Sequence, residues 1–560
     1  MKYPIDGRSP QTLKRDRFTF WTIILVLAFI FALIFIVYPF SNLLIQSFTK
    51  KNIEGFTLQN YLRFFEKKYY RAALMNSLKI CSLTTLLATA LGVPLAYIAT
   101  RYNIHLKKSI NLLIILSWLS PPFIGAYSWI VLLGRAGFLT KILNGIGIQI
   151  GSIYGFGGMM LVFTLKLFPI VFMYVSNALK SIDASLEEAS ESLGSSKMKR
   201  LFTVTFPVIL PTILSSALMV FMTSLADFGT PRLIGEGYKT LPVVIYEEFM
   251  SETGSDAGFA SMLSVVIVLV ALAILVVQKL FIDSKSYNMN GLNPPAVQPL
   301  SGWKRMTASV SVFFFAFLAV LPQITVMTTS FLKTNGPAFL AEFSLDNYRA
   351  VISKMGTNIR NTFLFSFIAI AVIVLLAMLV AYLVVRRKSK ATATLDLLMM
   401  APYVIPGSVI GISLIIAFNS GNIILTGTAM ILIVSYIIRK MPYTLRSSIG
   451  ILYQMDPSIE EASISLGASP MKTFYKITAR IMLGGVLSGA VLSFVSTINE
   501  LSSTVMLYTG KTATISVAIY GEIFKNGYGN AAALSSILTL TTIICLALFN
   551  KLTDGKGMGA

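Results

Sequence analysis

The stretch Phe363–Val385 reads FLFSFIAIAVIVLLAMLVAYLVV and contains no charged residue. A helix needs about 20 consecutive apolar residues to cross the hydrocarbon core of a bilayer, so this run is long enough to span a membrane. Equally uncharged runs occupy Trp21–Val37 and Ala260–Val277. Runs of this kind exclude a soluble enzyme, a secreted disulfide scaffold and a disordered chain, and they predict a polytopic membrane protein.

The composition of the whole chain supports this interpretation. Of its 560 residues, 55% are hydrophobic and only 12% are charged, whereas soluble domains carry about 25% charged residues. We expect helices rather than a barrel, because the runs show no alternation of polar and apolar residues. The fold class is therefore an all-α polytopic membrane protein with about twelve transmembrane helices. The candidate spans lie near residues 19–46, 73–99, 110–133, 157–178, 206–230, 259–281, 306–330, 361–385, 395–418, 423–438, 481–506 and 531–550.

The distribution of basic residues predicts the orientation of the chain. The net charge is +22, which on a soluble protein would suggest nucleic acid as a partner. If the N-terminus lies in the cytoplasm, most Lys and Arg residues fall in cytoplasmic segments, as the positive-inside rule requires. We therefore expect both termini to be cytoplasmic, and no nucleic-acid partner is needed to explain the charge.

The two halves of the chain are copies of one six-span unit. At an offset of 285 residues, Asn76, Ala96, Tyr97 and Arg101 match Asn361, Ala381, Tyr382 and Arg386. Further along the offset becomes 273, so the second half is shorter between its third and fourth spans. Six is even, which predicts two parallel six-helix repeats with a pathway between them. We expect a first transmembrane domain at 1–282, a cytoplasmic linker at 283–302 and a second domain at 303–560.

The segments after the fourth and tenth spans carry the strongest motif. They read DASLEEASESLG at Asp183–Gly194 and DPSIEEASISLG at Asp456–Gly467. Aspartate is a favoured N-cap, and proline is favoured at the first helical position, as at Pro457. Glycine permits the left-handed turn that ends a helix. We predict a short helix, a bend and a second helix in the loops near 182–207 and 455–480. Two copies at equivalent places favour a docking surface over a solvated loop.

These loops resemble the EAA loop of the permeases of ATP-binding cassette importers. The shared pattern is Glu-Ala-Ser, three residues and then Gly, and in the first copy Val204 and Phe206-Pro207 follow, with Arg480 replacing Pro207 in the second copy. By this resemblance, nearly the whole chain is two fused permease units of the binding-protein-dependent type. In that family the loop holds a coupling helix that docks in a groove of the ATPase subunit. The resemblance assigns this role to Glu188, Ala189, Gly194, Glu461, Ala462 and Gly467.

The resemblance also implies a substrate and partners. The stretches Ala226–Pro231 and Leu241–Tyr246 are most similar to those of fused ferric-iron permeases, although permeases for phosphonates, sugar phosphates, thiamine and polyamines share much of them. The implied mechanism is alternating access in the bacterial cytoplasmic membrane. Two ATPase subunits would bind ATP and Mg²⁺, and a periplasmic or lipid-anchored binding protein would deliver the substrate. No cofactor is expected on this chain.

The sequence offers no motif for chemistry. A phosphate loop requires Gly, four residues and then Gly-Lys-Ser/Thr; residues 510–512 read Gly-Lys-Thr, but Val505 replaces the first glycine. The single histidine, His105, cannot build a catalytic triad or a histidine-rich metal site. We therefore predict a transport subunit without a catalytic or metal site, whose ATP is hydrolysed by a separate subunit. A twelve-helix secondary transporter is the weaker alternative, because residues 101–108 lack its Gly-x-x-x-Asp-Arg signature.

Two carboxylates stand out within the predicted spans. Asp227 and Glu500 match at the offset of 273, near the outer ends of the fifth and eleventh spans. A carboxylate in a span usually faces a cavity or a partner. One hypothesis is that both acids, with Asn499, line the translocation pathway and favour a cation, because hard cations prefer oxygen ligands. The other is structural pairing, with Lys79 or Lys166 as the candidate partner.

Overall fold

The computed structural model describes residues 20–50, 55–118, 120, 122–149, 151–251, 256–283, 293 and 295–552. Within these residues the chain is almost entirely helical, with one antiparallel hairpin. The first half contains α1 (Phe20–Ala32), η2 (Leu33–Val37), α2 (Tyr38–Ser47), α3 (Gln59–Glu66), α4 (Lys68–Arg101), α5 (Lys107–Trp118), α6 (Pro122–Leu133), α7 (Phe138–Gly145), α8 (Phe156–Lys180), α9 (Ala184–Ser192), α10 (Lys197–Arg200), η3 (Leu201–Thr205), α11 (Phe206–Ala226), α12 (Gly229–Ile234), α13 (Leu241–Met250) and α14 (Ala257–Asp283). The second half contains α15 (Gly302–Thr329), β1 (Leu332–Asn335), β2 (Ala338–Phe343), α16 (Asp346–Arg386), α17 (Lys390–Met400), η4 (Ala401–Tyr403), α18 (Gly407–Phe418), α19 (Ala429–Gln454), α20 (Ser458–Ser465), α21 (Pro470–Thr473), η5 (Phe474–Thr478), α22 (Ala479–Ile498), α23 (Thr504–Leu507), α24 (Ile515–Phe524) and α25 (Tyr528–Leu552).

The long helices agree with a polytopic membrane protein. In the described residues, ten helical segments are long and apolar enough to cross a membrane, and the bent pair α17–α18 makes an eleventh. The tenth predicted span, at 423–438, is wrong in its bounds, because α19 begins at Ala429 and continues to Gln454. Arg439 and Lys440 do not end this helix, since both reach the carboxylate of Glu500 inside the bundle. Paired charges of this kind are tolerated within a membrane protein.

Two spans are broken into shorter helices. α17 and α18 meet at an angle of 111°. Pro402 lies in the single turn η4 between them, and Pro406 directly precedes α18 with extended backbone angles. Proline cannot donate the helical hydrogen bond and disfavours helical geometry in the residue before it, which accounts for the break. The third predicted span is likewise covered by two helices, α5, which ends at Trp118, and α6, which begins at Pro122.

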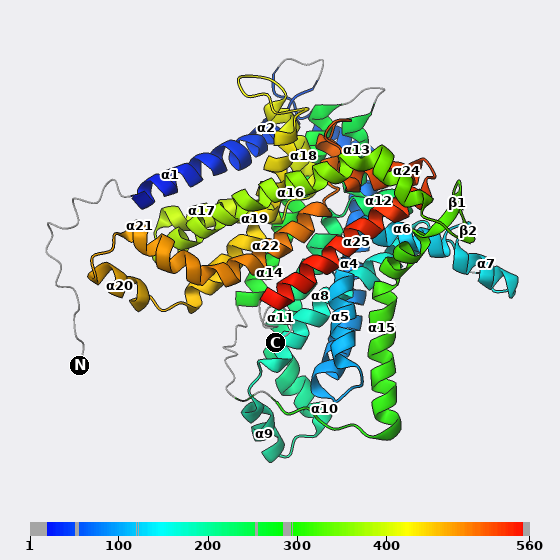
Figure 1. Ribbon diagram of the computed structural model, residues 1–560, viewed down its shortest axis with the longest axis horizontal. Helices are drawn as coiled ribbons and strands as arrows, with labels where there is room; N and C mark the ends of the chain where they lie inside the picture. The colour runs from blue at the N-terminus through cyan, green and yellow to red at the C-terminus, as the bar shows by residue number, and fades with distance from the viewer. Residues whose placement is uncertain are drawn as a thin grey trace.

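The first span of each half packs against the other half. α2 lies against α14 of its own half and α18 of the second half, while α15 lies against α25 and against α5 and α6 of the first half (Figure 1). The rings of Phe35 and Phe418 are 5.9 Å apart. The backbone N–H of His105 donates to Ser309 Oγ at 2.9 Å. This reciprocal exchange follows the pseudo-twofold relation of the two halves and holds them together.

The core of each half is a group of three helices. α4, α8 and α11 pack together in the first half, and α16, α19 and α22 in the second. Gly92 lets α4 approach α8 closely, because a Cβ atom there would lie 2.8 Å from Val171 Cβ. Small residues at helix contacts permit close van der Waals packing in a membrane, where the hydrophobic effect does not draw helices together.

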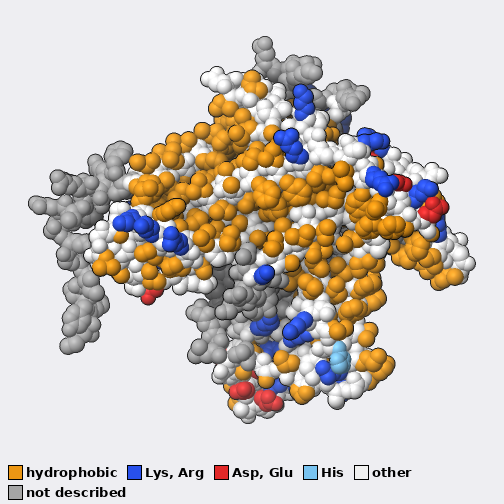
Figure 2. Space-filling view, viewed as in Figure 1, with side chains coloured by type: hydrophobic (Ala, Val, Ile, Leu, Met, Phe, Trp, Pro, Cys, Tyr) orange, Lys and Arg blue, Asp and Glu red, His pale blue; other side chains and the backbone are white. Residues whose placement is uncertain are grey.

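The segments that follow α2 and α15 repeat as well. The hydroxyls of Ser47 and Tyr61 are hydrogen-bonded at 2.8 Å, and those of Ser330 and Tyr348 at 2.9 Å. The flank of the molecule between its two ends is largely apolar, and Lys and Arg side chains gather towards the ends (Figure 2). This distribution is expected of a protein whose flank faces lipid and whose ends face water.

Candidate functional site

Each half carries a short helix that projects from the bundle. These helices, α9 and α20, follow α8 and α19, as predicted. The Asp183 and Asp456 carboxylates each accept a hydrogen bond from the backbone N–H two residues on, at 3.0 and 2.9 Å. That backbone hydrogen bond lowers the pKa of the Asp456 carboxyl. Gly194 and Gly467 have φ angles of +79° and +86°, which L side chains disfavour. The predicted cap at Asp183 and both left-handed turns are therefore confirmed. The second helix, α20, begins one residue later than predicted, with Pro457 as its N-cap, although Asp456 still accepts from its first backbone N–H.

The predicted coupling residues all lie on the surface of these loops. Glu188, Ala189, Gly194, Glu461, Ala462 and Gly467 are exposed. α9 and α20 lie at well-separated points, α9 at the bottom and α20 at the left of Figure 1. Their role in coupling stays a prediction, and their positions leave both helices free to meet a partner.

Sequence analysis missed a set of exposed apolar residues on the same loops. Leu193 and Leu466 follow the two helices with 87% and 90% of their surface exposed. We call two matched sets the docking faces: Leu186, Leu193, Met198 and Phe202 in the first half, and Ile459, Leu466, Met471 and Tyr475 in the second, all exposed. The sets correspond at the offset of 273, which was the signal available in the sequence. Exposed apolar residues gathered on polar loops are typical of interaction surfaces.

In the first half, two adjacent glutamates have different surroundings. Glu188 is exposed, whereas Glu187 turns back towards the bundle. Glu187 Oε1 accepts hydrogen bonds from the Arg101 guanidinium at 2.6 Å and from the Thr205 hydroxyl at 2.9 Å. The Arg101 side chain is only 4% exposed. Glu187 therefore attaches α9 to the C-terminal end of α4 and to Thr205, the residue that directly precedes α11.

The second half repeats this arrangement. Glu460 Oε1 accepts from Arg386 Nε at 3.3 Å and from the Thr478 hydroxyl at 3.1 Å. The Tyr382 hydroxyl donates to the other carboxylate oxygen of Glu460 at 3.3 Å. Glu460 is buried, while its neighbour Glu461 is exposed. In each half the first glutamate of the pair thus faces the membrane domain and the second faces outward.

The first of the two predicted membrane carboxylates is paired with a lysine. Asp227 directly follows α11 instead of lying within it, and its side chain is 4% exposed. Lys166 Nζ donates to Asp227 Oδ2 at 2.8 Å. The backbone N–H and hydroxyl of Thr230 also donate to this carboxylate, at 3.0 and 3.1 Å. Of the two candidate partners, Lys166 forms the ion pair with Asp227. Lys79 is exposed elsewhere on α4.

The second carboxylate has matching partners. Glu500 also lies beyond its helix, α22, and is 5% exposed. It pairs with Arg439, which occupies the position equivalent to Lys166, and with Lys440 Nζ at 2.7 Å. The backbone N–H of Ser503 donates to it at 3.1 Å. Gly407 leaves room for the Arg439 guanidinium, since a Cβ atom there would lie 2.5 Å from it.

These contacts favour the structural hypothesis for both carboxylates. Each is neutralised by a cation of the fourth or tenth span and accepts hydrogen bonds from the bend that follows it. The predicted pathway role of Asp227, Asn499 and Glu500 is not thereby tested and stays a prediction. Asn499 differs from the two acids, because its Oδ1 atom is buried and has no hydrogen-bond partner among the described residues.

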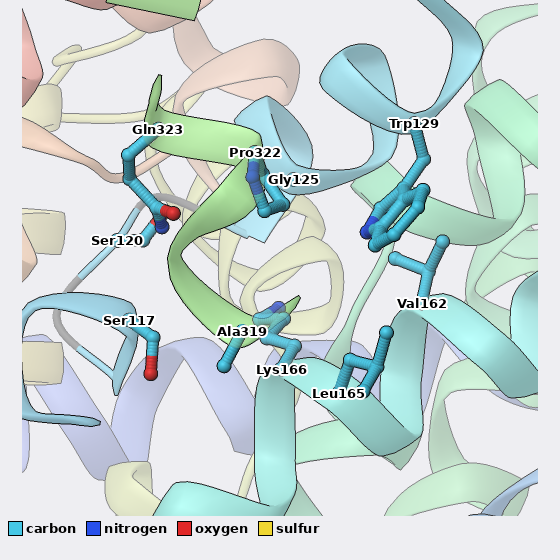
Figure 3. Close-up of a pocket in the computed structure, with 10 residues that line it drawn as sticks. All are labelled: Ser117, Ser120, Gly125, Trp129, Val162, Leu165, Lys166, Ala319, Pro322 and Gln323. Carbon is cyan, nitrogen blue, oxygen red and sulfur yellow. The ribbon is translucent and has the colours of Figure 1, made fainter. Parts of the chain in front are cut away.

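A small pocket lies beside Lys166, where α15 meets the first half. Figure 3 shows the side chains that line it: Ser117, Ser120, Gly125, Trp129, Val162, Leu165, Lys166, Ala319, Pro322 and Gln323. Gln323 Oε1 is buried without a partner among the described residues. Most of the lining is apolar, but Ser117, Ser120, Lys166 and Gln323 supply polar partners of the kind that a buried water needs. Nowhere in the described residues do three or more His, Cys, Asp or Glu side chains form a group that could hold a metal ion.

At the opposite end from α9 and α20, short helices of the two halves meet. Phe228, Arg232, Tyr246 and Tyr520 join the two halves here, and we call them the outer gate after the role proposed for them below. Arg232 Nε donates to the Tyr520 hydroxyl at 3.2 Å, and the ring of Phe228 lies 4.8 Å from Tyr246 and 6.2 Å from Tyr520. Burial raises the pKa of Tyr246 to about 12. The halves are therefore in contact at this end, while α9 and α20 lie apart at the other (Figure 1).

Comparison with known proteins places both halves in one group of sequences. The sequence model of the family described as "Binding-protein-dependent transport system inner membrane component" matches residues 90–284 and 373–555. The chain is 30% identical to the ferric transport system permease protein FbpB of Actinobacillus pleuropneumoniae, over 96% of this chain and 79% of that protein. It is 29% identical to the putative ferric transport system permease protein FbpB 1 of Haemophilus influenzae, over 92% and 81%. It is also 27% identical to the molybdenum transport system permease protein ModB of Escherichia coli K12, over 36% of this chain and 90% of that protein.

Proposed function

The chain belongs to the family of binding-protein-dependent transport system inner membrane components, and we propose that it is the fused permease of an ATP-binding cassette importer for ferric iron. As a multi-pass protein of the inner membrane, it supplies the pathway and performs no covalent chemistry. The duplicated docking faces are the observation that carries this proposal.

Each docking face receives one ATPase subunit. Leu193 and Leu466 are almost fully exposed on otherwise polar loops, and burial of such a side chain contributes about 1.5–3 kcal/mol to association. Glu188 and Glu461 stand beside them, with Ala189, Gly194, Ala462 and Gly467 on the same surfaces. Two faces imply two ATPase subunits, which bind ATP and Mg²⁺ and hydrolyse the nucleotide. The exposed glutamates then meet basic groups of those subunits.

Transport proceeds by alternating access between the two halves. The contact of the outer gate and the separation of α9 from α20 correspond to a state closed to the outside. ATP binding draws the two ATPase subunits together, brings α9 and α20 closer and opens the outer gate. A periplasmic or lipid-anchored binding protein then releases its substrate into the opening. Hydrolysis returns the halves to the state described above.

The substrate assignment rests on the relatives that span nearly the whole chain. The FbpB protein of Actinobacillus pleuropneumoniae and the FbpB 1 protein of Haemophilus influenzae are both named ferric transport permeases, and each match covers more than 90% of this sequence. The electrostatic argument for a cation adds little, because Asp227 and Glu500 are already neutralised by cations of the chain. If these residues and Asn499 also line the pathway, the ion would meet polar groups just beyond α11 and α22. Phosphonates, sugar phosphates, thiamine, polyamines and molybdate are the competing substrates.

The orientation follows from the proposed partners. α9 and α20 face the cytoplasm because ATP is there. With α19, whose paired charges keep it out of the apolar set, the eleven apolar spans of the described residues become twelve, and an even number puts both termini on the same side. We retain the predicted domains at 1–282 and 303–560. Most of the linker at 283–302 lies outside the described residues; its described end contacts the first half, where the Gln298 N–H donates to the Arg101 carbonyl at 2.8 Å.

Reconstituted uptake tests this function. The chain, its two ATPase subunits and the binding protein are placed in liposomes, and entry of radiolabelled ferric iron is followed with and without internal ATP. We expect uptake that requires ATP and the binding protein and that survives collapse of the proton gradient. Loss of uptake with the gradient would indicate a secondary transporter. Uptake of one of the competing substrates in place of ferric iron would correct the substrate alone.

A further inference from the structure

α4 and α16 are attached at their inner ends to the two coupling helices. Arg101 is the last residue of α4 and binds Glu187, and Arg386 is the last residue of α16 and binds Glu460. Both carboxylates also hold the threonine at the start of the following transmembrane helix. A displacement of α9 or α20 is therefore transmitted directly to the end of a long membrane helix.

The other end of α4 is attached to the outer gate. The Asn76 side-chain amide donates to the Lys239 carbonyl at 3.0 Å, and Ser77 Oγ accepts from the backbone N–H of Leu241 at 2.8 Å. Leu241 is the first residue of α13, the helix that carries Tyr246. Both bonds are made to backbone atoms of the segment that leads into α13. They therefore fix the start of that helix independently of its side chains.

The outer end of α16 makes the equivalent contacts in the second half. The Asn361 amide donates to two backbone carbonyls of the segment before α24, both at 3.0 Å. Thr362 Oγ1 accepts from the backbone N–H of Ile515 at 2.8 Å. Ile515 is the first residue of α24, which carries Tyr520. Asn361 and Arg386 match Asn76 and Arg101 in the repeat, so both halves attach the same helix at both ends.

We propose that α4 and α16 act as rods that connect each coupling helix to the outer gate, with Arg101 and Arg386 as the inner attachments and Asn76 and Asn361 as the outer ones. The attachments in each rod are 25 residues apart, or about 37 Å along a helix. The one non-helical residue within α16, Met355, lies before this section. This inference rests on the proposed function and specifies which helices carry the motion.

The proposal explains why adjacent glutamates face opposite ways. Glu188 and Glu461 contact the partner, whereas Glu187 and Glu460 transmit its movement to the rods. A docking role alone would require only the exposed glutamates. It would not require an arginine paired with a glutamate at the inner end of each long helix. It would also not require an asparagine bonded to the backbone before each gate helix.

The test uses the complete transporter in liposomes and two pairs of substitutions. Arg101→Gln with Arg386→Gln detaches the inner ends, and Asn76→Leu with Asn361→Leu detaches the outer ends. Arg446→Gln is the matched control, because it breaks a half-exposed ion pair with Asp396 outside the rods. Gate opening is measured as the distance between spin labels at Met250→Cys and Lys525→Cys, which are exposed on α13 and beside α24, in a Cys545→Ser background.

We expect both double variants to retain the ATPase subunits and to hydrolyse ATP within twofold of the wild-type rate. The ATP-dependent change in label distance should disappear, and iron uptake per ATP should fall at least tenfold. Arg101→Lys with Arg386→Lys should restore most of the coupling. The inference is overturned if the gate still opens in either double variant, or if the arginine variants release the ATPase subunits. Failure of the wild-type complex to hydrolyse ATP would instead refute the proposed function.

Discussion

The ion pair between Lys166 and Asp227 allows a quantitative test of how the bundle tolerates charge. The two side chains are 12% and 4% exposed and their charged atoms lie 2.8 Å apart. Asp227→Asn keeps an oxygen for one of the two hydrogen bonds from Thr230 but leaves the Lys166 ammonium buried without a counter-charge. Removal of one partner of a buried pair costs about 3–5 kcal/mol, so we expect a loss of that size in the free energy of unfolding.

The double variant isolates the charge. Lys166→Met with Asp227→Asn removes both charges, keeps the carboxamide oxygen and fills the space of the lysine stem. Replacement of a whole buried pair is close to neutral, so we expect the double variant to lie within about 1 kcal/mol of wild type. Asp256→Asn is the matched control, because the Arg63–Asp256 pair is 31% and 22% exposed and such pairs contribute about 0–1 kcal/mol.

The assay is reversible unfolding of the purified protein in mixed micelles, followed by tryptophan fluorescence. A loss below 1 kcal/mol in Asp227→Asn, or equal losses in the single and double variants, would refute the reasoning. Iron uptake by the folded double variant then separates the two hypotheses for Asp227. Normal uptake supports the structural role, and absent uptake supports the pathway role.

Three further predictions concern the docking faces and the outer gate. Leu193→Ser with Leu466→Ser should change the free energy of unfolding by no more than about 0.5 kcal/mol, because both residues are exposed. The double variant should nevertheless lose the ATPase subunits in a pull-down. If the ATPase subunits stay bound, the docking faces are refuted. Gly467→Val places a β-branched side chain at a φ of +86°, which costs about 1–2 kcal/mol. We therefore expect a titration to show ATPase binding about tenfold weaker than in wild type. Equal affinity of the variant and wild type would contradict this. Arg232→Ala removes the hydrogen bond to Tyr520, which stabilises the closed gate by about 1.4 kcal/mol. We therefore expect the rate of ATP hydrolysis without binding protein to rise about tenfold. An unchanged rate would show that closure of the gate does not depend on this residue.

The pH dependence of the gate forms a further expectation. Burial raises the pKa of Tyr246 to about 12, above its value of about 10 in an unfolded chain. A raised pKa means that folding favours the protonated phenol, so its contribution is complete below about pH 10 and is lost as the pH rises towards about 12. Absorbance titration of wild type against Tyr246→Phe measures this directly. A Tyr246 phenol that ionises near pH 10 would contradict the partial burial of this side chain at the gate.

Local signals in the sequence predicted most of the fold. Apolar runs located the spans because the bilayer requires long apolar helices, and the cap at Asp183 and the turns at Gly194 and Gly467 were predictable because those interactions join near neighbours. The bounds of α19 were not, since its cations are neutralised by Glu500, 60 or more residues away in the sequence.

The site was predictable only in part, for a similar reason. Glu187 and Glu188 stand in the same local context, and only the distant Arg101 determines which of them turns inward. The exchange of α2 and α15 between the halves has no local signal at all, because it depends on contacts between helices. The repeat nevertheless identified Asn76 and Arg101, with their counterparts, before the structure showed what they bind.

The number of ATPase subunits held by one chain tests the central claim most directly. Native mass spectrometry of the purified complex reports this number without any assumption about the substrate. Two equivalent docking faces on one fused permease predict two ATPase subunits per chain, falling to one when only Leu466→Ser is present. A complex with a single ATPase subunit in wild type, or with none, would contradict the account.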